Sequence, residues 1–294
     1  MESFAFEAPT TLDAALTLLA ERARDKRRTQ ILAGGTDMIV QMRNLDPEPR
    51  IIVDIKRIPE TRAIRLDDDG LQVGAAVPAA ELTARADIQA LYPGLVEAID
   101  LIGSTQIQGR ATLGGNLCTA SPAGDTIPAM IANDGVCVIA SADGTRELPV
   151  KDFVTGVQKN ALEPGEMVVA LRFPHPGPRS GDGYLRFIPR TEMDIAVASA
   201  GVRVHLAEDG TIAAARVAIG AVAVTALEVP DAASALVGTD GGEDAMNALA
   251  AACSAAASPI TDRRGTADYR RRVVGVLARR AAGSAIARAR GEDQ

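Results

Sequence analysis

A short predicted strand and a paired-glycine turn occur in the sequence Thr29-Gln30-Ile31-Leu32-Ala33-Gly34-Gly35-Thr36-Asp37, and the pattern of residues 38–43 predicts a helix directly after them. Adjacent glycines let the backbone take positive φ and direct successive N–H groups into one concavity. The helix adds the positive end of its dipole, so the turn suits a phosphate or diphosphate. The motif is neither GxGxxG nor GxxxxGK[ST], which disfavours nicotinamide and Walker-type sites. An ordinary Gly-Gly turn is the alternative.

The residues on either side of this turn predict a small parallel sheet. Residues 4–6 read as a strand, and a helix follows for which Thr10 and Asp13 are the expected capping pair. A basic stretch at residues 22–28 ends that helix. Residues 51–55 are continuously apolar, as in a buried strand. The first 55 residues are therefore expected to form β-α-β-α-β.

A second segment of the same character reads Thr112-Leu113-Gly114-Gly115-Asn116. Two such loops, about eighty residues apart, can approach one diphosphate from both sides. Thr112 and Asn116 offer side-chain hydrogen bonds to phosphate or sugar oxygens. The presence of both loops strengthens the anion-site hypothesis over that of two unrelated turns.

The rest of the chain predicts an α+β fold in two units. A hairpin at residues 64–73 precedes helices at 79–85 and 93–102, and a short helix ends at 132. Strands are expected at residues 136–141 and 167–173, before a proline-rich boundary at 173–178. The second unit is expected to hold strands at 184–188, 196–206 and 211–220, then helices at 231–237, 243–257 and 266–289.

Composition narrows the possible functions. The 294 residues carry a formal charge of −7, which disfavours nucleic-acid binding. No apolar run approaches the ~20 residues of a membrane span, and the start lacks the features of a signal peptide, so a cytoplasmic protein is expected. Three dispersed cysteines and two histidines predict no metal or iron–sulfur site. No nucleophile or paired-acid motif is present, so no catalytic side chain is assigned.

Several charged residues have two readings from sequence. Asp125 suits a sugar hydroxyl or a helix N-cap. Arg186, Arg190 and Asp194 suit either surface ion pairs or, for an arginine, the pyrimidine edge of a flavin. The arginine-rich segment 263–290 has apolar residues at helical spacing. A solvated helix face is its ordinary interpretation, an acidic partner is the functional alternative, and nucleic acid comes third.

Several motifs follow one another in a specific order along the whole chain. Beyond the two glycine segments, it comprises Phe4-Ala5-Phe6-Glu7-Ala8-Pro9, Ser121-Pro122-Ala123-Gly124-Asp125, Arg190-Thr191-Glu192-Met193-Asp194-Ile195-Ala196, Ile260-Thr261-Asp262-Arg263-Arg264-Gly265 and Tyr269-Arg270-Arg271. In this order the set resembles the FAD-binding medium subunit of the molybdenum hydroxylases, the family of xanthine dehydrogenase and aerobic carbon monoxide dehydrogenase.

The resemblance implies a two-lobed FAD-binding domain of the vanillyl-alcohol-oxidase (PCMH) type over residues 1–176, with lobes at about 1–56 and 57–176. A smaller α+β domain over 180–294 would follow. FAD would be non-covalent, because no His or Cys stands where related oxidases attach it. The implied cofactor contacts are Ile31, Leu32, Ala33, Gly34, Gly35, Thr36 and Asp37 around the diphosphate, Thr112, Gly114, Gly115 and Asn116 as the second loop, Asp125 on the flavin-chain hydroxyls, Ile102 and Val168 lining the pocket, and Arg186 where members often have Lys near the ring.

The resemblance also implies an electron-transfer role in a complex. A large partner would carry the molybdenum cofactor and a small partner the 2Fe–2S clusters, as a dimer of heterotrimers, with NAD, a quinone or oxygen as terminal acceptor. The motif Gly34-Gly35-Thr36-Asp37 stands where the carbon monoxide enzymes tend to have Gly-Gly-His-Ser, which disfavours that substrate. The alternatives are a self-contained flavin oxidoreductase of the same fold and a non-catalytic assembly subunit.

Overall fold

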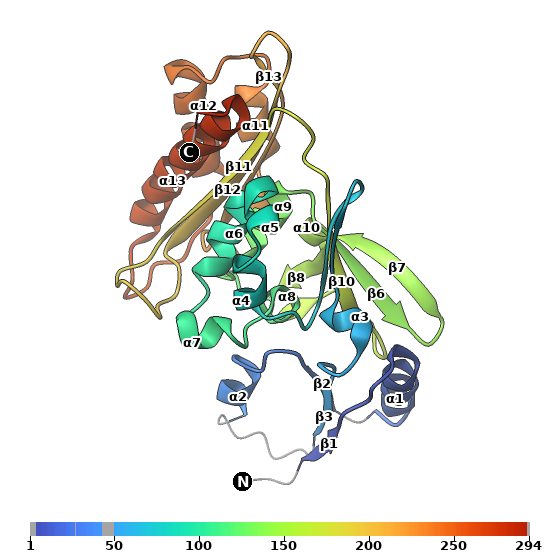
Figure 1. Ribbon diagram of the computed structural model, residues 1–294. Helices are drawn as coiled ribbons and strands as arrows, with labels where there is room; N and C mark the ends of the chain where they lie inside the picture. Colours follow the sequence, from blue (N-terminus) through green and yellow to red (C-terminus); the bar gives the residue numbers. More distant parts are fainter. Residues whose placement is uncertain (1–3, 27, 43–49, 293–294) are drawn as a thin grey trace.

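The fold was analysed in a computed structural model that describes residues 4–26, 28–42 and 50–292. Figure 1 shows three successive regions: a small lobe that holds the N-terminus, a middle lobe, and a C-terminal region of sheet and helices. Each region is built around its own sheet, of three, five and four strands respectively. None of the helices described has the length and apolar character that crossing a membrane requires.

The N-terminal lobe is the predicted β-α-β-α-β unit. Its parallel strands β1 (Ala5–Glu7), β3 (Ile51–Asp54) and β2 (Thr29–Leu32) lie in the order β1-β3-β2. The connecting helices are α1 (Leu12–Arg24) and α2 (Met38–Gln41). The expected cap was wrong by one residue, since the Thr11 hydroxyl accepts from Ala14 N at 3.3 Å. The predicted end of α2 at residue 43 lies outside the described residues.

The middle lobe contains an antiparallel sheet in the order β4-β5-β10-β6-β7. The predicted hairpin is confirmed, with Gly70 in its turn at φ +128. The strands are β4 (Ile64–Asp67), β5 (Gly70–Gly74), β6 (Val136–Ser141), β7 (Gly144–Pro149) and β10 (Met167–Pro174), with a separate pair of β8 (Val154–Gly156) and β9 (Lys159–Asn160).

The helices of the middle lobe are more numerous than expected. Helix α5 was not predicted, and it separates from α6 because Tyr92 precedes Pro93 and takes a non-helical φ of −133. The helices are α3 (Pro59–Arg62), α4 (Ala79–Thr83), α5 (Ala86–Leu91), α6 (Pro93–Asp100), α7 (Thr105–Gln108), α8 (Leu113–Cys118), α9 (Ile127–Ala132) and α10 (Val150–Phe153).

The C-terminal region follows its predicted order closely. Strands β11 (Ser180–Phe187), β12 (Ala198–Leu206), β13 (Ile212–Gly220) and β14 (Leu227–Glu228) form an antiparallel sheet. Helices α11 (Pro230–Leu236), α12 (Glu243–Ala256) and α13 (Ala267–Arg290) follow. Helix α13 packs on β11 and β12, whereas α6 and α9 of the middle lobe contact the same sheet (Figure 1).

A buried carboxylate joins the C-terminal sheet to the middle lobe. Asp182 on β11 accepts hydrogen bonds from Gly94 N and Leu95 N at the start of α6, both at 3.0 Å, and from Asn133 Nδ2 at 2.7 Å. Burial raises the pKa of Asp182, while these three donors act in the opposite direction. The contact therefore fixes the sheet against α6 through a fully desolvated hydrogen-bond network.

Candidate cofactor site

The two glycine segments lie against each other at the junction of the N-terminal and middle lobes. A Cβ atom added at Gly34 would lie 2.0 Å from the carbonyl oxygen of Arg110, two residues before Thr112. Gly35 has φ +81, a left-handed conformation that side chains rarely adopt. The sequence therefore needs glycine at both positions to bring the turn after β2 onto the segment before α8.

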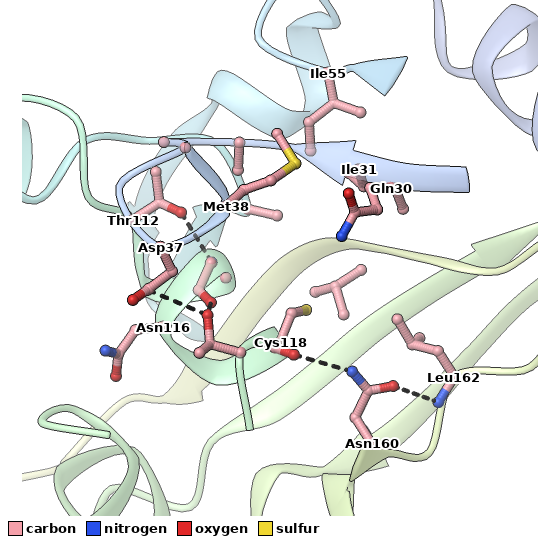
Figure 2. A pocket seen from close by; sticks show the side chains of 18 of the residues that line it. Gln30, Ile31, Asp37, Met38, Ile55, Thr112, Asn116, Cys118, Asn160 and Leu162 are labelled. Atoms are coloured by element: carbon pink, nitrogen blue, oxygen red, sulfur yellow. Dashed lines mark hydrogen bonds between the residues drawn. The ribbon is translucent and has the colours of Figure 1, made fainter. Parts of the chain in front are cut away.

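A hollow of about 620 Å³ opens between these segments (Figure 2). That volume lies in the ~300–1,000 Å³ range of small-molecule and cofactor sites. Residues from the N-terminal and the middle lobe line it, which is the arrangement expected for an extended ligand held between two lobes. The lining includes the predicted residues Ile31, Ala33, Gly34, Gly35, Thr36, Asp37, Ile102, Thr112, Gly114, Gly115, Asn116 and Val168.

The chemistry of this lining fits an anion bound by main-chain groups. The N–H groups of Gly34, Gly35, Thr36 and Asp37 make no hydrogen bond to another described residue. Within the described part of the chain, no Lys, Arg or His lines the hollow. Unpaired amides are donors without their own counter-charge, so the turn fits a diphosphate through a cradle of N–H groups.

The second segment is a helix start and not the loop that was expected. Thr112 is the N-cap of α8, and its Oγ1 accepts from Gly115 N at 2.9 Å. The buried hydroxyl oxygen therefore caps its own helix, while its proton remains available to donate to a ligand, so the predicted contact of Thr112 with the cofactor stays a prediction. Asn116 Oδ1 accepts from the Thr126 hydroxyl at 2.8 Å.

Hydrogen bonds from α8 connect opposite walls of the hollow (Figure 2). The Thr119 hydroxyl donates to Asp37 Oδ2 at 3.2 Å, joining α8 to the first glycine turn. Asn160 Nδ2 donates to the Cys118 carbonyl at 3.1 Å, and Asn160 Oδ1 accepts from Leu162 N at 3.2 Å. Burial raises the pKa of the Cys118 thiol to about 12, so the thiol is neutral here.

Three predicted contact residues do not line the hollow. Leu32 belongs to strand β2, while Asp125 and Arg186 form an ion pair, with Arg186 Nη1 2.7 Å from Asp125 Oδ1. The same Nη1 donates to the Leu101 carbonyl at 2.8 Å, immediately before the lining residue Ile102. The pair therefore lies next to the Ile102 end of the wall.

The structure contradicts two interpretations made from the sequence: that Asp125 is a helix N-cap and that Arg186 forms a surface ion pair. The N-cap of α9 is Thr126 and not Asp125. The Arg186 side chain is only 4% exposed, so its ion pair is not a surface pair. Burial raises the pKa of Asp125, and the charge and hydrogen bond of Arg186 oppose that shift. The two groups compensate each other in a largely desolvated position.

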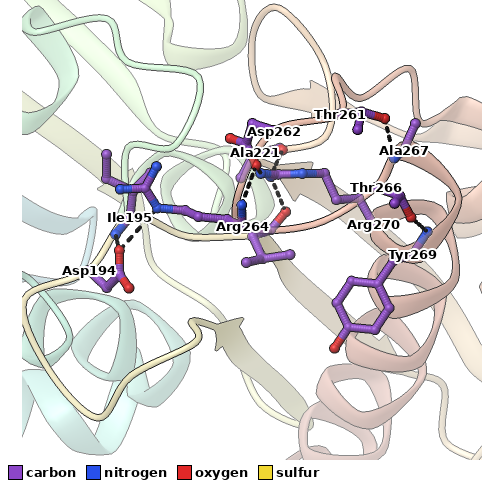
Figure 3. Close-up of polar contacts among 11 residues, drawn as sticks. Asp194, Ile195, Ala221, Thr261, Asp262, Arg264, Thr266, Ala267, Tyr269 and Arg270 are labelled. Carbon is purple, nitrogen blue, oxygen red and sulfur yellow. Dashed lines mark hydrogen bonds and ion pairs between the residues drawn. The ribbon is translucent and has the colours of Figure 1, made fainter.

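The other arginine motifs form a polar network beside the C-terminal sheet (Figure 3). Asp194 Oδ1 lies 3.1 Å from Arg264 Nε, and Asp262 Oδ1 lies 2.8 Å from Arg270 Nη2. The Arg270 side chain is 4% exposed and also donates to the Val197 carbonyl at 2.8 Å. None of these residues lines the hollow. Their ion pairs and hydrogen bonds instead connect segments of the C-terminal region to one another.

Sequence reasoning missed much of the far wall of the hollow. It includes Gln158, Asn160 and the segment from Leu162 to Glu166, which precedes β10. These residues carry no recognisable motif, and only their position next to the glycine turns identifies them. Further lining residues are Leu19, Ala23, Thr29, Gln30, Met38, Gln41, Ile55, Ala75, Ala111, Cys118 and Thr119.

The fold and this hollow define a protein with a site suited to an extended anionic cofactor, between a lobe with a parallel sheet and a lobe with an antiparallel sheet. Two family models match the chain. The FAD binding domain in molybdopterin dehydrogenase matches residues 2–176, and the CO dehydrogenase flavoprotein C-terminal domain matches residues 183–285. The chain belongs to the family of FAD-binding subunits of the molybdenum hydroxylases.

Individual relatives agree with this membership. The chain is 32% identical to the carbon monoxide dehydrogenase medium chain of Hydrogenophaga pseudoflava, over 97% of this chain and 98% of that one. It is 31% identical to the nicotinate dehydrogenase FAD-subunit of Eubacterium barkeri, over 81% of each. It is 28% identical to the putative xanthine dehydrogenase FAD-binding subunit of Escherichia coli K12, over 98% of each.

Solved structures show the same fold. A carbon monoxide dehydrogenase structure from Hydrogenophaga pseudoflava, at 32% identity, superimposes with a TM-score of 0.89 over 97% of this chain and 98% of that chain. Quinoline 2-oxidoreductase from Pseudomonas putida 86 superimposes with a TM-score of 0.88 at 25% identity, over 99% and 98%. These similarities confirm the predicted family and the mixed α+β class with its FAD-binding domain.

Proposed function

We propose that the chain binds FAD in the hollow and relays electrons within a molybdenum hydroxylase complex. Electrons would arrive from 2Fe–2S clusters of a small partner, after substrate oxidation at the molybdenum cofactor of a large partner. The terminal acceptor would be NAD, a quinone or oxygen. The observation that supports this proposal best is the cradle of unpaired amides at Gly34–Asp37, which closes against the segment before α8.

The proposed domain organisation assigns the hollow to one domain. Residues 1–176 would form the FAD domain, with lobes at about 1–56 and 57–176, and residues 180–294 the C-terminal domain. The turn from Ile31 to Asp37 would hold the diphosphate together with Gly114 and Gly115. Ile102 and Val168, both buried, would provide apolar surface for a flat ring system.

Asp125 and Arg186 have a proposed role at the Ile102 end of the hollow. Because Arg186 bonds both Asp125 and the Leu101 carbonyl, it holds the wall that precedes Ile102. Asp125 presents its remaining acceptor capacity toward the hydroxyls of the flavin side chain. Bound FAD would supply exchange between one-electron and two-electron carriers. The side chains of this chain would bind and orient the cofactor and exclude water from it.

The proposed assembly is a dimer of heterotrimers, and its proposed location is the cytoplasm. Multi-subunit relatives support the large and small partners. The three cysteines are free thiols, which favours a reducing compartment.

An absorption spectrum of the purified chain tests the cofactor assignment. We expect a flavin spectrum, or its appearance after FAD is added, with release of free FAD on denaturation. A colourless chain that takes up no FAD would contradict the proposal and favour an assembly subunit. Turnover of a small substrate by the isolated flavoprotein, without partners, would favour the self-contained oxidoreductase.

A further inference from the structure

A second hollow of about 750 Å³ is lined by residues of α12 and α13. These two helices lie on the side of the C-terminal sheet away from the middle lobe (Figure 1). Helix α13 approaches α12 closely here, because a Cβ added at Gly275 would lie 2.7 Å from the Ala250 carbonyl. Residues Glu243 to Ser254 of α12 line one side, a length of about 16 Å. We call this feature the α12–α13 groove.

The floor of the groove consists of small and apolar side chains. Helix α12 contributes Ala250 and Ala251, and α13 contributes Gly275 and Val276, which is 45% exposed. From residue 245 to 256, α12 carries no charged residue. Small neutral side chains lose little conformational entropy and little hydration when another surface covers them. Burial of this helix face against another surface therefore costs little free energy.

The rim of the groove is basic. Arg272, Arg279 and Arg280 line it at helical spacing around Val276. Arg279 already donates to Asn247 Oδ1 at 2.9 Å. Arg272 and Arg280 are exposed and make no hydrogen bond or ion pair with any residue in the ranges that the structure describes.

The charge of this face is opposite to that of the whole protein. The groove is lined by three arginines and one carboxylate, Glu243, whose Oε1 lies 3.7 Å from Arg279 Nη2, whereas the chain has a formal charge of −7. A concentrated positive face on an acidic protein attracts a negative surface and disfavours the protein's own average surface. The uncompensated guanidiniums at Arg272 and Arg280 are suited to bidentate carboxylate pairs.

We propose that the α12–α13 groove docks an acidic segment of another subunit of the complex. An apolar side chain of that segment would cover Val276 and Ala251, and its carboxylates would pair with Arg272 and Arg280. This inference rests on the proposed function, since it requires that the chain assembles with partners. It adds a binding surface that is separate from the cofactor hollow, with which it shares no lining residue.

The test uses the FAD-loaded chain and the remaining subunits of its complex, with the dissociation constant measured at low and moderate salt. The double variant Arg272→Glu/Arg280→Glu should weaken assembly at least tenfold and reduce its salt dependence. The matched control is Arg57→Glu/Arg65→Glu, which changes the charge equally at two exposed arginines that also have no partner among the described residues. Equal weakening by both pairs, or by neither, would overturn the proposal.

A steric variant tests the floor without a change of charge. Ala251→Trp should fill the groove and weaken assembly at least tenfold, whereas Ala248→Trp, exposed on the same helix outside the lining, should not. Assembly unchanged by Ala251→Trp would contradict the docking site. Loss of self-association, with subunit affinity unchanged, would assign the groove to a second copy and overturn the proposal. The FAD content of each isolated variant separates these outcomes from failure of the proposed cofactor function.

Discussion

Gly34 lies directly against the backbone of Arg110, so that a Cβ at Gly34 would be 2.0 Å from the Arg110 carbonyl oxygen. This contact joins segments that are 76 residues apart in the chain and sets the width of the cofactor hollow. Because the obstructing atom belongs to the main chain, no side-chain rotation can relieve the clash. The two turns can keep this spacing only with glycine at position 34.

The variant Gly34→Ala should therefore separate the two turns. We expect FAD affinity to fall at least tenfold, and overpacking to destabilise the fold by about 1–3 kcal/mol. Fluorescence titration and thermal unfolding measure the two effects. The matched control is Gly109→Ala, because Gly109 has no positive φ and an added Cβ would meet its nearest neighbour among the described residues, the Gln106 carbonyl oxygen, at 3.6 Å. Normal FAD binding by Gly34→Ala would contradict this account of the turn.

Removal of the Arg186 charge should strongly destabilise the protein. The variant Arg186→Met leaves Asp125 buried without its cation, a change that costs about 3–5 kcal/mol for a buried pair. Arg186→Lys should recover part of this loss. Arg190→Met is the control, since Arg190 is 76% exposed and its pair with Asp194 is worth less than about 1 kcal/mol. Urea unfolding measures the free energy of unfolding of each variant. An equal loss in Arg186→Met and Arg190→Met would contradict the importance of the buried pair.

Acid should weaken the contact between Asp262 and Arg270. The hydrogen bond from Arg270 lowers the pKa of Asp262 below its ordinary value of 3.8. The folded state thus binds its proton less readily, so this contribution to stability is present above that value and is lost as pH falls through the folded pKa. Asp262→Asn should be less stable than the parent at neutral pH, with a difference that shrinks in acid.

Thermal unfolding as a function of pH measures this effect. Asn keeps the acceptor for Arg264 N, so the variant isolates the charge. The control Asp268→Asn removes a pair whose carboxylate is 92% exposed and should change stability little. A difference between parent and Asp262→Asn that stays constant from neutral pH into acid would show that the carboxylate charge is not responsible.

Salt should have little effect on FAD binding. The hollow has no cationic side chain among its described lining residues, so the diphosphate would be held by amides at short range. The net charge of −7 repels the anion at long range, and salt screens that repulsion. Affinity should therefore stay constant or rise slightly up to about 0.15 M salt. A steep loss of affinity with salt would reveal a cationic ligand outside the lining.

The thiol of Cys118 should react slowly with alkylating reagents. Desolvation raises the pKa of this half-buried thiol to about 12, so the reactive thiolate is scarce at pH 8, whereas Cys137 and Cys253 are buried. Because Cys118 lines the hollow, bound FAD should slow its labelling further. Mass spectrometry after timed labelling measures both rates. Rapid labelling that is insensitive to FAD would contradict this placement.

The sequence predicted those features that local chemistry determines. The strand before Gly34 and the paired glycines were recognisable because glycine alone permits the positive φ at Gly35 and the contact at Gly34. The arginine-rich helix α13 was evident from its spacing, and Thr266 caps it through Tyr269 N at 3.2 Å. The prediction that the two glycine segments lie close together rested on the paired glycines that both contain.

The remaining features depend on tertiary contacts that no local pattern encodes. Asn160 and the segment before β10 reach the hollow only because β10 pairs with both β5 and β6. The partner of Asp125 is 61 residues away, so sequence alone could not choose between a cap, a ligand and an ion pair. Thr112 showed the residue type of an N-cap, but the glycines after it obscured the helix that it starts.

A hollow that attracts its anion with main-chain amides has a consequence for protein evolution and engineering. Every residue type except proline carries the same N–H group, so lining side chains other than those at Gly34 and Gly35 can change while the shape of the turn is kept. Substitutions that alter redox properties or acceptor access can then accumulate around a constant anchor. An engineer who wishes to alter cofactor affinity must reshape the loop, because no cationic side chain among the described lining residues is available there to replace.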